Sequence, residues 1–273
     1  MDLKSIYKKA NTNHFAVPQF NVYNLEIIRG VVKGAEQEKA PVILGTSERA
    51  AKSIGMEEIV ALVSMYKKKG LPVFLNLDHS SHIEEAKRAI DLGYDSVHFD
   101  GSEYEYEENV RMCRDIVSYA RRKRVLVEGE IEKVGKGSLT NEEIALKFIK
   151  ETGVNLLAVN INNLHGIVGK EGNPPLDINQ LKKIKDKMKD EFLVLHGGSG
   201  ISDEDIREAI TSGIVKINVA TELRMIFLKV LKEVFAKSEE NDIIYQYPSL
   251  VMPSIQKLVQ EKLKLFKTYE YAR

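Results

Sequence analysis

Residues 191–219, EFLVLHGGSGISDEDIREAITSGIVKINV, contain one complete strand–helix–strand unit. An apolar run ends in a glycine-rich turn, a helical segment follows, and a second apolar run closes the unit. Both runs are apolar on successive residues, as in strands that are covered on both faces. A unit of this kind uses roughly 30 residues and joins two parallel strands. The stretch therefore predicts a parallel sheet flanked by helices.

The same pattern recurs along the chain at intervals of about 28 residues. Strand-like runs begin at residues 15, 41, 71, 95, 125, 154, 191 and 213. Helical periodicity fills the gaps, as in residues 24–39, NLEIIRGVVKGAEQEK, where the apolar residues share one face. Eight alternating strands and helices favour a (β/α)8 TIM barrel, with a doubly wound open sheet as the alternative.

The length leaves no room for a second domain. The chain has 273 residues, and a barrel of eight units uses about 250. No shift in composition and no linker rich in Pro, Gly or Ser divides the chain, so residues 1–273 are predicted to form one domain. After residues 239–250 a last amphipathic helix is predicted over Met252–Lys267. We expect this C-terminal helical extension to pack on the barrel or on a neighbouring subunit.

Composition narrows the class of protein. Apolar residues make up 43% and charged residues 29% of the chain, an ordinary globular balance. Forty basic and forty acidic residues give a net charge of zero, which argues against a nucleic-acid partner. No run approaches the roughly 18 apolar residues of a membrane span. The single cysteine, Cys113, is predicted to be structural and suits a reducing compartment, so we expect a cytoplasmic protein.

Polar residues interrupt the apolar strands almost entirely at their carboxyl ends. In chain order they are Asn21, Ser47, Asp78 with His79, Asp100, Glu130, His165, His196, and Asn218 with Thr221. In a barrel all of these ends ring one mouth, where the active sites of this fold lie. The sequence therefore predicts an active site built from all eight strand ends.

Three of the six histidines, His79, His165 and His196, stand at such strand ends. Three imidazoles that converge from different strands are typical of a catalytic zinc site with an open fourth position. The alternative is three unrelated buried histidines. His14, before the first strand, and His98, inside the fourth, are predicted to be structural.

A second theme is anion binding at the glycine-rich turn HGGSG and at the end of the eighth strand. The available donors are the backbone N–H groups of Gly197 and Gly198 and the side chains of Ser199, Asn218 and Thr221. A glycine-rich turn before a helix can hold phosphate, and the loops after strands seven and eight often do so in this fold. Asp100 and Glu130 either bind a second cation or orient the metal ligands.

Together these residues resemble the class II, metal-dependent ketose-bisphosphate aldolases, the family of fructose- and tagatose-bisphosphate aldolases. The resemblance runs through FNVYNLE, LNLDHSSHIEEAKRAIDLGYDSVHFDGS, VEGEIEKVG and LHGGSGISDEDIREAITSGIVKINVATELR. It covers nearly the whole chain and keeps the order and spacing of the motifs. The D-H pair, the two later H-G motifs and the N-x-x-T end of the eighth strand make it specific.

The resemblance implies a reversible lyase of carbohydrate metabolism, glycolysis included, that cleaves a ketose (bis)phosphate into dihydroxyacetone phosphate and an aldehyde. One catalytic zinc ion per chain would be held by His79, His165 and His196 and would polarise the ketone carbonyl. Asp78 would take the proton of the C4 hydroxyl during cleavage. The family's second metal site matches Asp100 and Glu130. The positions matched to substrate or phosphate binding are Asn21, Ser47, Gly166, Gly197, Ser199, Asn218, Ala220 and Thr221.

The resemblance also implies partners beyond zinc. A monovalent cation, Na⁺ or K⁺, often assists at the phosphate in this family. The family commonly forms dimers or tetramers, so we expect a homodimer or homotetramer. The implied partner is a small sugar phosphate, with neither a nucleic acid nor a membrane involved.

Three features depart from the family pattern. The loop after the fifth strand lacks a clear counterpart of the acid that exchanges the C3 proton, and Glu132 is the nearest substitute. Ala220 resembles the tagatose type. Ser249 stands where the family carries an arginine for the distal phosphate, and a serine cannot replace that charged contact. We therefore expect a different aldehyde half, or one held by another cation. The candidates are Lys133, Lys136 and Lys170.

Other functions stay open on the residues alone. A metal-dependent sugar-phosphate epimerase or isomerase would share the barrel and its histidines, but needs acid–base groups on both faces of its substrate. A catalytically silent partner subunit would need neither Asp78 nor complete zinc ligands. A Schiff-base aldolase is disfavoured because the sixth strand has no lysine, which leaves only Lys216 on the eighth.

Overall fold

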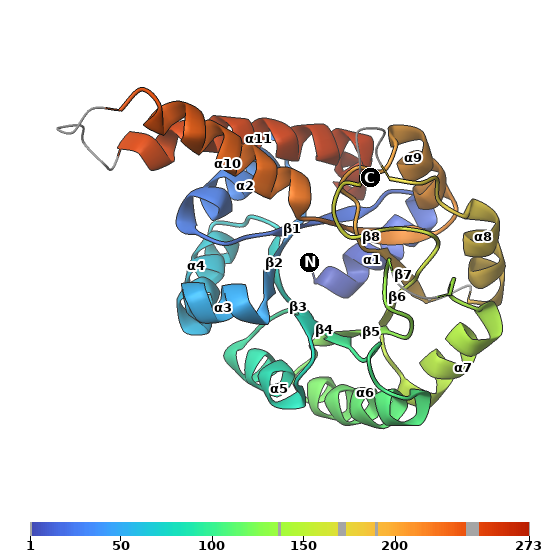
Figure 1. The fold of residues 1–273 in the computed structure, drawn as a ribbon. Helices are drawn as coiled ribbons and strands as arrows, with labels where there is room; N and C mark the ends of the chain where they lie inside the picture. The colour runs from blue at the N-terminus through green and yellow to red at the C-terminus, as the bar shows by residue number, and fades with distance from the viewer. Residues whose placement is uncertain (1, 136–137, 169–172, 189–190, 239–245, 273) are drawn as a thin grey trace.

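Eight parallel strands form a closed barrel in the computed structural model, which describes residues 2–135, 138–168, 173–188, 191–238 and 246–272 (Figure 1). The strands are β1 (Val17–Asn21), β2 (Val42–Ser47), β3 (Val73–Ser80), β4 (Ser96–Asp100), β5 (Leu126–Glu130), β6 (Leu156–Ala158), β7 (Phe192–Leu195) and β8 (Ile214–Val219). They pair in chain order, and β1 also pairs with β8, with Gln19 opposite Asn218. This last pairing confirms the predicted barrel and excludes the open sheet.

Helices surround the strands, and α2 to α9 form the outer ring in Figure 1. The helices of the described residues are α1 (Leu3–Asn13), α2 (Leu25–Gln37), α3 (Glu48–Ile54), α4 (Met56–Lys68), α5 (Ile83–Leu92), α6 (Tyr106–Arg121), α7 (Glu142–Thr152), α8 (Ile178–Lys187), α9 (Asp203–Thr211), α10 (Thr221–Phe235) and α11 (Gln246–Leu265), followed by the 3-10 helix η1 (Thr268–Ala272). Several begin at a side-chain cap, since Asn24, Asn141 and Ser202 each accept a backbone N–H of the first turn.

The apolar core is divided by the barrel wall. One cluster fills the space between the strands and the ring of helices. A second cluster closes the amino-terminal end of the barrel, where Tyr7 of α1 packs on Phe192 of β7 with their ring centroids 5.5 Å apart. Helix α1 lies against that end, and the polar strand ends lie at the opposite, carboxyl end of the barrel. The fold thus places the polar strand ends around one mouth.

The predicted C-terminal extension corresponds to α11, which lies beside α10 and projects with it beyond the barrel in Figure 1. The prediction placed the last helix at Met252–Lys267, whereas α11 begins at Gln246 and ends at Leu265. Pro248 does not prevent the earlier start, because the first turn of a helix needs no backbone N–H donors. The helix packs on α2, where Gly30 and Gly34 admit its side chains.

Two further predictions concern the single cysteine and membrane-spanning helices. Cys113 lies on the inner face of α6 and is fully buried, as a structural cysteine should be. Within the described part of the chain, no helix combines the length and apolar character that crossing a membrane requires.

Candidate active site

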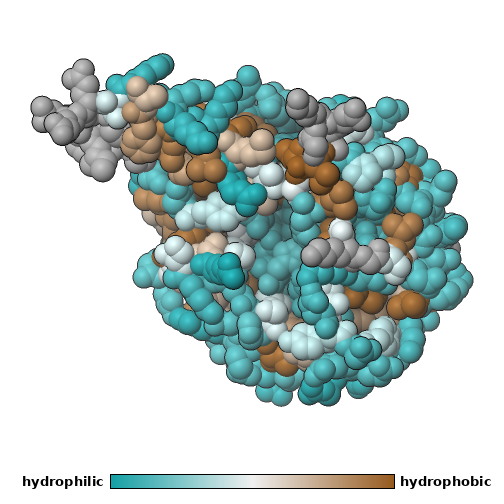
Figure 2. All heavy atoms as spheres, viewed as in Figure 1, coloured by the Kyte–Doolittle hydropathy of each residue, from teal (hydrophilic) through white to brown (hydrophobic). Residues whose placement is uncertain are grey.

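A cavity of about 460 Å³ opens at the carboxyl ends of the strands. It is lined by Asn21, Asp78, His79, Asp100, Glu130, Lys133, His165, Gly166, His196, Gly197, Ser199, Asn218, Ala220, Thr221 and Arg224. The space-filling view shows hydrophilic atoms in the hollow at the centre of the ring of helices (Figure 2). The structure therefore brings together every predicted site residue except Ser47 and Glu132.

Three imidazoles gather in this cavity. Nε2 of His79 lies 2.9 Å from Nδ1 of His196, and their ring centroids are 4.6 Å apart. The ring of His165 lies 5.1 Å from that of His79 and 6.1 Å from that of His196. His165 is exposed at the mouth. Desolvation, with the charges of His196 and His79, lowers the pKa of His165 to about 4.

The backbone turns sharply at the first of these histidines. His79 has φ of +49°, in the left-handed region that residues other than glycine rarely adopt. The register between β3 and β4 also shifts between Leu77 and Ser80. This irregularity directs the imidazole into the mouth, and the strain fits a functional position.

A carboxylate stands behind each of two imidazoles. Nδ1 of His79 lies 2.9 Å from Asp100 Oδ2, and Nε2 of His196 lies 2.7 Å from Glu128 Oε1. Each carboxylate favours a proton on the ring nitrogen that faces it, which leaves a lone pair on the other nitrogen. The two nitrogens that keep a lone pair, Nε2 of His79 and Nδ1 of His196, then lie 2.9 Å apart. A cation bound to both nitrogens would stabilise this arrangement.

The donor set therefore fits a metal ion. Imidazole nitrogens with carboxylates behind them are typical zinc ligands. Ligand atoms lie within 4.8 Å of one another in two groups, Asp78 with His79, His98 and His196, and His79 with Asp100 and Glu130; the predicted ligand His165 belongs to neither group. In the second group Glu130 Oε2 is buried and makes no hydrogen bond to any described residue, and its neighbours are the imidazoles of His98 and His79.

His98 was predicted to be structural rather than a metal ligand. The ring is fully buried, yet it belongs to the cluster, since its centroid lies 4.6 Å from that of His79. The backbone N–H of His79 donates to Nδ1 of His98 at 3.1 Å, and Nε2 lies 3.3 Å from Glu130 Oε2. His98 stands two residues before Asp100, so both side chains lie on the inward face of β4. Its hydrogen bond with the backbone of His79 supports the strained turn there.

Asp78 is a buried carboxylate held in one orientation. Asn21 Nδ2 donates to its Oδ2 at 2.8 Å, and Asn218 Nδ2 donates to its Oδ1 at 3.1 Å. Burial raises the pKa of Asp78, but the nearby His79 and His98 outweigh burial and hold this pKa well below its ordinary value. The site therefore contains an ionised, preorientated base beside the imidazoles.

Beneath the mouth lies a residue pair that the sequence analysis did not identify as part of the site. Glu128 and Lys216 are buried in the barrel, and Lys216 Nζ lies 2.5 Å from Glu128 Oε2. Burial raises the pKa of Glu128, but Lys216 and His98 reverse the effect and hold it below the ordinary value. Strand alternation was the available signal, since each stands two residues before a predicted site residue, Glu130 and Asn218.

The anion-binding side is formed by the loops after β6, β7 and β8. Gly166 and Gly197 have φ of +94° and +67°, and a Cβ on Gly197 would lie 2.0 Å from the carbonyl oxygen of Leu164. The hydroxyl of Ser199 accepts the backbone N–H of Glu222 at 3.2 Å, which ties the β7 loop to the start of α10. Compact turns of this kind expose backbone N–H groups to an anion.

Two cations also line the cavity. Lys133 forms an ion pair with Glu103. Arg224, on the first turn of α10, was not predicted, and no ion pair joins it to any residue that the structure describes. Burial raises the pKa of Tyr23, and the charge of Arg224 opposes that rise, so Arg224 lies close to the end of β1. The unmatched guanidinium is therefore on the same side of the mouth as Asn21.

The remaining candidates lie elsewhere. The hydroxyl of Ser47 caps α3 by accepting the backbone N–H of Ala50 at 3.3 Å. Glu132 accepts the hydroxyl of Thr140 at 2.8 Å and does not line the cavity. Lys136 and Lys170 lie outside the described residues.

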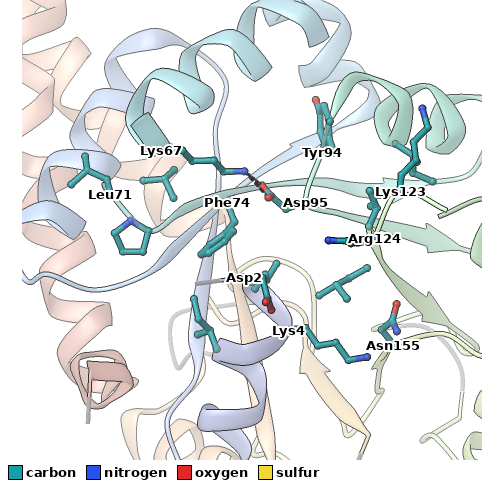
Figure 3. Close-up of a pocket in the computed structure, with 18 of the residues that line it drawn as sticks. Asp2, Lys4, Lys67, Leu71, Phe74, Tyr94, Asp95, Lys123, Arg124 and Asn155 are labelled. Atoms are coloured by element: carbon teal, nitrogen blue, oxygen red, sulfur yellow. Dashed lines mark hydrogen bonds and ion pairs between the residues drawn. The ribbon is translucent and has the colours of Figure 1, made fainter. Parts of the chain in front are cut away.

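A second, larger cavity of about 1330 Å³ lies at the opposite end of the barrel, beside α1. Figure 3 shows Lys67 paired with Asp95 there, and Lys4 and Arg124 are also part of its wall. It contains no histidine and none of the predicted site residues. Neither of the two groups of possible metal ligands lies in its lining, so the smaller cavity is the candidate active site.

Comparisons with known proteins concern the family and the fold of the chain. The family model described as fructose-bisphosphate aldolase class-II matches residues 1–270. The YdjI aldolase from Escherichia coli K12 superposes with a TM-score of 0.88 at 32% identity, over 98% of this chain and 97% of that chain. A putative fructose-1,6-bisphosphate aldolase from Coccidioides immitis gives 0.85 at 28% identity, over 96% and 95%. The fructose-bisphosphate aldolase of Campylobacter jejuni gives 0.82 at 24% identity, over 97% and 94%, and shares the fold.

Proposed function

This chain belongs to the class II fructose-bisphosphate aldolase family, and on that premise we propose that it is a zinc-dependent ketose-phosphate aldolase. It would reversibly cleave a ketose phosphate into dihydroxyacetone phosphate and an aldehyde. The observation that supports this best is the carboxylate of Asp78, which is buried beside converging imidazoles at the mouth of the barrel and held there by Asn21 and Asn218. An ionised base next to a Lewis acid is what cleavage between C3 and C4 requires.

In this proposal His79, His165 and His196 hold the zinc ion. When bound, zinc supplies a Lewis acid that polarises the ketone carbonyl. Asp78 accepts the proton of the C4 hydroxyl as the C3–C4 bond breaks, and C4 leaves as the aldehyde carbonyl. The electron pair of that bond passes to C3 and is delocalised onto the ketone oxygen, and a proton then added at C3 completes dihydroxyacetone phosphate. Asn21 and Asn218 prevent the carboxylate from rotating away, so the proton is returned from the same position during condensation.

The substrate phosphate would sit on the turns after β6, β7 and β8. Gly166, Gly197, Ser199 and Thr221 line that part of the cavity. Asn218 Oδ1 is a buried acceptor with no hydrogen bond to the described residues. It could supply an oxygen ligand to Na⁺ or K⁺, which would neutralise part of the phosphate charge.

Metal removal and reconstitution test the proposed reaction. We expect chelator-treated protein to lose lyase activity and to regain it with zinc. Asp78→Asn should abolish turnover while zinc content stays near that of the wild type, and His165→Asn should lower zinc content. His14→Asn is the matched control, because His14 lies at the end of α1, away from the cavity. Full activity in metal-free protein would contradict the proposal.

We further infer that the distal end of the substrate carries an anion held by Arg224, with Lys133 as the other described cation in the cavity. Ser249 lies on α11 and offers no positive charge in place of the family's arginine. A screen of ketose 1-phosphates against ketose 1,6-bisphosphates and acidic ketose 1-phosphates tests this. A preference for substrates with no distal charge would contradict it.

The wider setting follows from the substrate class. Cleavage of a sugar phosphate belongs to carbohydrate metabolism, glycolysis included. The lone buried Cys113 supports a reducing, cytoplasmic location. Fractionation of cells that express the tagged protein would test the location.

A further inference from the structure

Lys216 is a lysine enclosed inside the barrel. It lies on β8 with 1% of its surface exposed, and Glu128 on β5, also 1% exposed, faces it. Removing two charges from water is expensive, and replacing such a pair by apolar side chains is often neutral or stabilising. Neither residue lines the cavity, and the proposed reaction gives neither a role. The pair therefore calls for an explanation other than stability.

The pair connects directly to one of the proposed zinc ligands. Lys216 Nζ donates a hydrogen bond to Glu128 Oε2, and the other oxygen of that carboxylate, Oε1, lies 2.7 Å from His196 Nε2. A carboxylate without a proton can only accept hydrogen bonds. His196 must therefore carry its proton on Nε2, and Nδ1 keeps the lone pair that faces His79.

The two histidines are orientated by different means. His79 relies on Asp100, which lies at the half-exposed rim and also accepts the hydroxyl of Ser102 at 2.6 Å. His196 relies on Glu128, whose only cationic side-chain neighbour at hydrogen-bond distance among the described residues is Lys216. The lysine thus fixes the rotation of Glu128 and keeps one oxygen directed at the imidazole.

We propose that the Lys216–Glu128 ion pair is a positioning device that holds His196 with Nε2 protonated and Nδ1 presented to the metal. This inference rests on the zinc site of the proposed function. Losing a carboxylate behind a metal-bound histidine typically weakens metal binding about 10- to 100-fold. The pair should therefore affect zinc affinity independently of its effect on stability.

Removing the charges of Lys216 and Glu128 one at a time and then together separates their effect on zinc affinity from their effect on the stability of the fold. Lys216→Met and Glu128→Met each leave one buried charge unpaired, so both should lower the melting temperature of the zinc-free protein. The double variant Lys216→Met with Glu128→Met removes both charges, and its zinc-free melting temperature should return close to the wild-type value. Its zinc dissociation constant, measured by competition with a chromophoric chelator, should stay about 10- to 100-fold above the wild-type value.

Ser96→Ala is the matched control. Ser96 is buried in the same barrel interior and donates to Asn76 at 2.6 Å, without contacting a proposed ligand. Its zinc dissociation constant should equal that of the wild type. Wild-type zinc affinity in the double variant would overturn the positioning role and leave the zinc proposal intact. Wild-type protein that fails to compete for zinc would overturn both.

Discussion

Among single residues, Arg224 shows how the fold can supply the cation that the sequence lacks at Ser249. In the sequence it follows a strand end by several residues, and nothing marks it as part of the site. In the barrel, α10 begins at the mouth, so its first turn brings Arg224 to the cavity wall. Proximity to Tyr23 places it near the end of β1, beside the residues that hold Asp78.

Arg224→Met should therefore change substrate preference. A lost hydrogen bond to a charged group costs about 1.5–3 kcal/mol, which corresponds to a roughly 10- to 100-fold fall in kcat/KM. We expect that fall for substrates with a distal phosphate or carboxylate. We expect no change for ketose 1-phosphates whose distal end carries no charge. Arg207→Met is the control, because Arg207 pairs with Asp203 on α9 outside the cavity. An equal loss on all substrates would contradict the assignment.

Cys113 allows a simpler prediction. Its side chain is fully buried on α6, and burial raises the pKa of Cys113 to about 12. At pH 8 the thiol therefore stays protonated, and the thiolate is the reactive form. We expect no reaction with a chromogenic disulfide reagent in the native protein and one thiol per chain after denaturation. Rapid titration of the native protein would show that α6 opens.

The candidate site could be predicted from the sequence wherever its residues interrupt an apolar run at a strand end. Asp78, His79 and Asn218 are of this kind. His98 was predicted to be structural, Lys216 was considered only as a possible Schiff-base lysine, and Glu128 was not considered. All three lie inside the strands, where only strand alternation assigns their side chains to the interior. Helix capping explains why Ser47 does not reach the cavity, since the same hydroxyl suits a helix start.

At the scale of elements, the packing of α11 on α2 depends on two glycines. A Cβ on Gly30 would lie 2.7 Å from Ile255 Cγ2, and one on Gly34 would lie 2.9 Å from Val259 Cβ. Helical periodicity predicts the apolar face of each helix, but not which faces meet. The start of α11 was also missed, because its apolar pattern is read from Met252 and the first turn at Gln246 carries little of it.

Gly30→Ala should therefore destabilise the protein although alanine favours helices. Crowding of a packed interface costs about 1–3 kcal/mol, and the gain in helix propensity offsets about 1 kcal/mol of it. Chemical denaturation should show a net loss of up to about 2 kcal/mol. In an Ile255→Ala background the methyl group gains room, so the same change should cost less. Equal costs in both backgrounds would show that α11 does not press on Gly30.

At the scale of the whole molecule, the repeat of about 28 residues predicts how many units the chain has, but not that they close. An open sheet shows the same alternation of strands and helices. Closure depends on the pairing of β1 with β8, whose residues are about 200 positions apart. That contact follows from the tilt and stagger of all eight strands together, which no local pattern contains.

The projecting arm of α10 and α11 carries the last prediction, that the protein self-associates. Met225, Leu228 and Phe235 are each about half exposed and share one face of α10, and Leu250 on α11 is also exposed. Figure 2 shows hydrophobic atoms along this arm. Exposed apolar side chains grouped in this way favour burial against another surface, and a net charge of zero offers no repulsion between copies.

We therefore expect sedimentation equilibrium to show a dimer or tetramer at micromolar concentration. The double variant Leu228→Asp with Phe235→Asp should shift the protein to a monomer, because a carboxylate buried in an apolar interface is costly. Its circular dichroism and zinc content should stay unchanged, since neither side chain contacts the cavity. Lys229→Glu alters charge at an exposed position of the same helix and should leave assembly intact. If the wild-type protein were a monomer, the prediction that the arm forms an interface would be wrong, because its apolar face would then be stable in water.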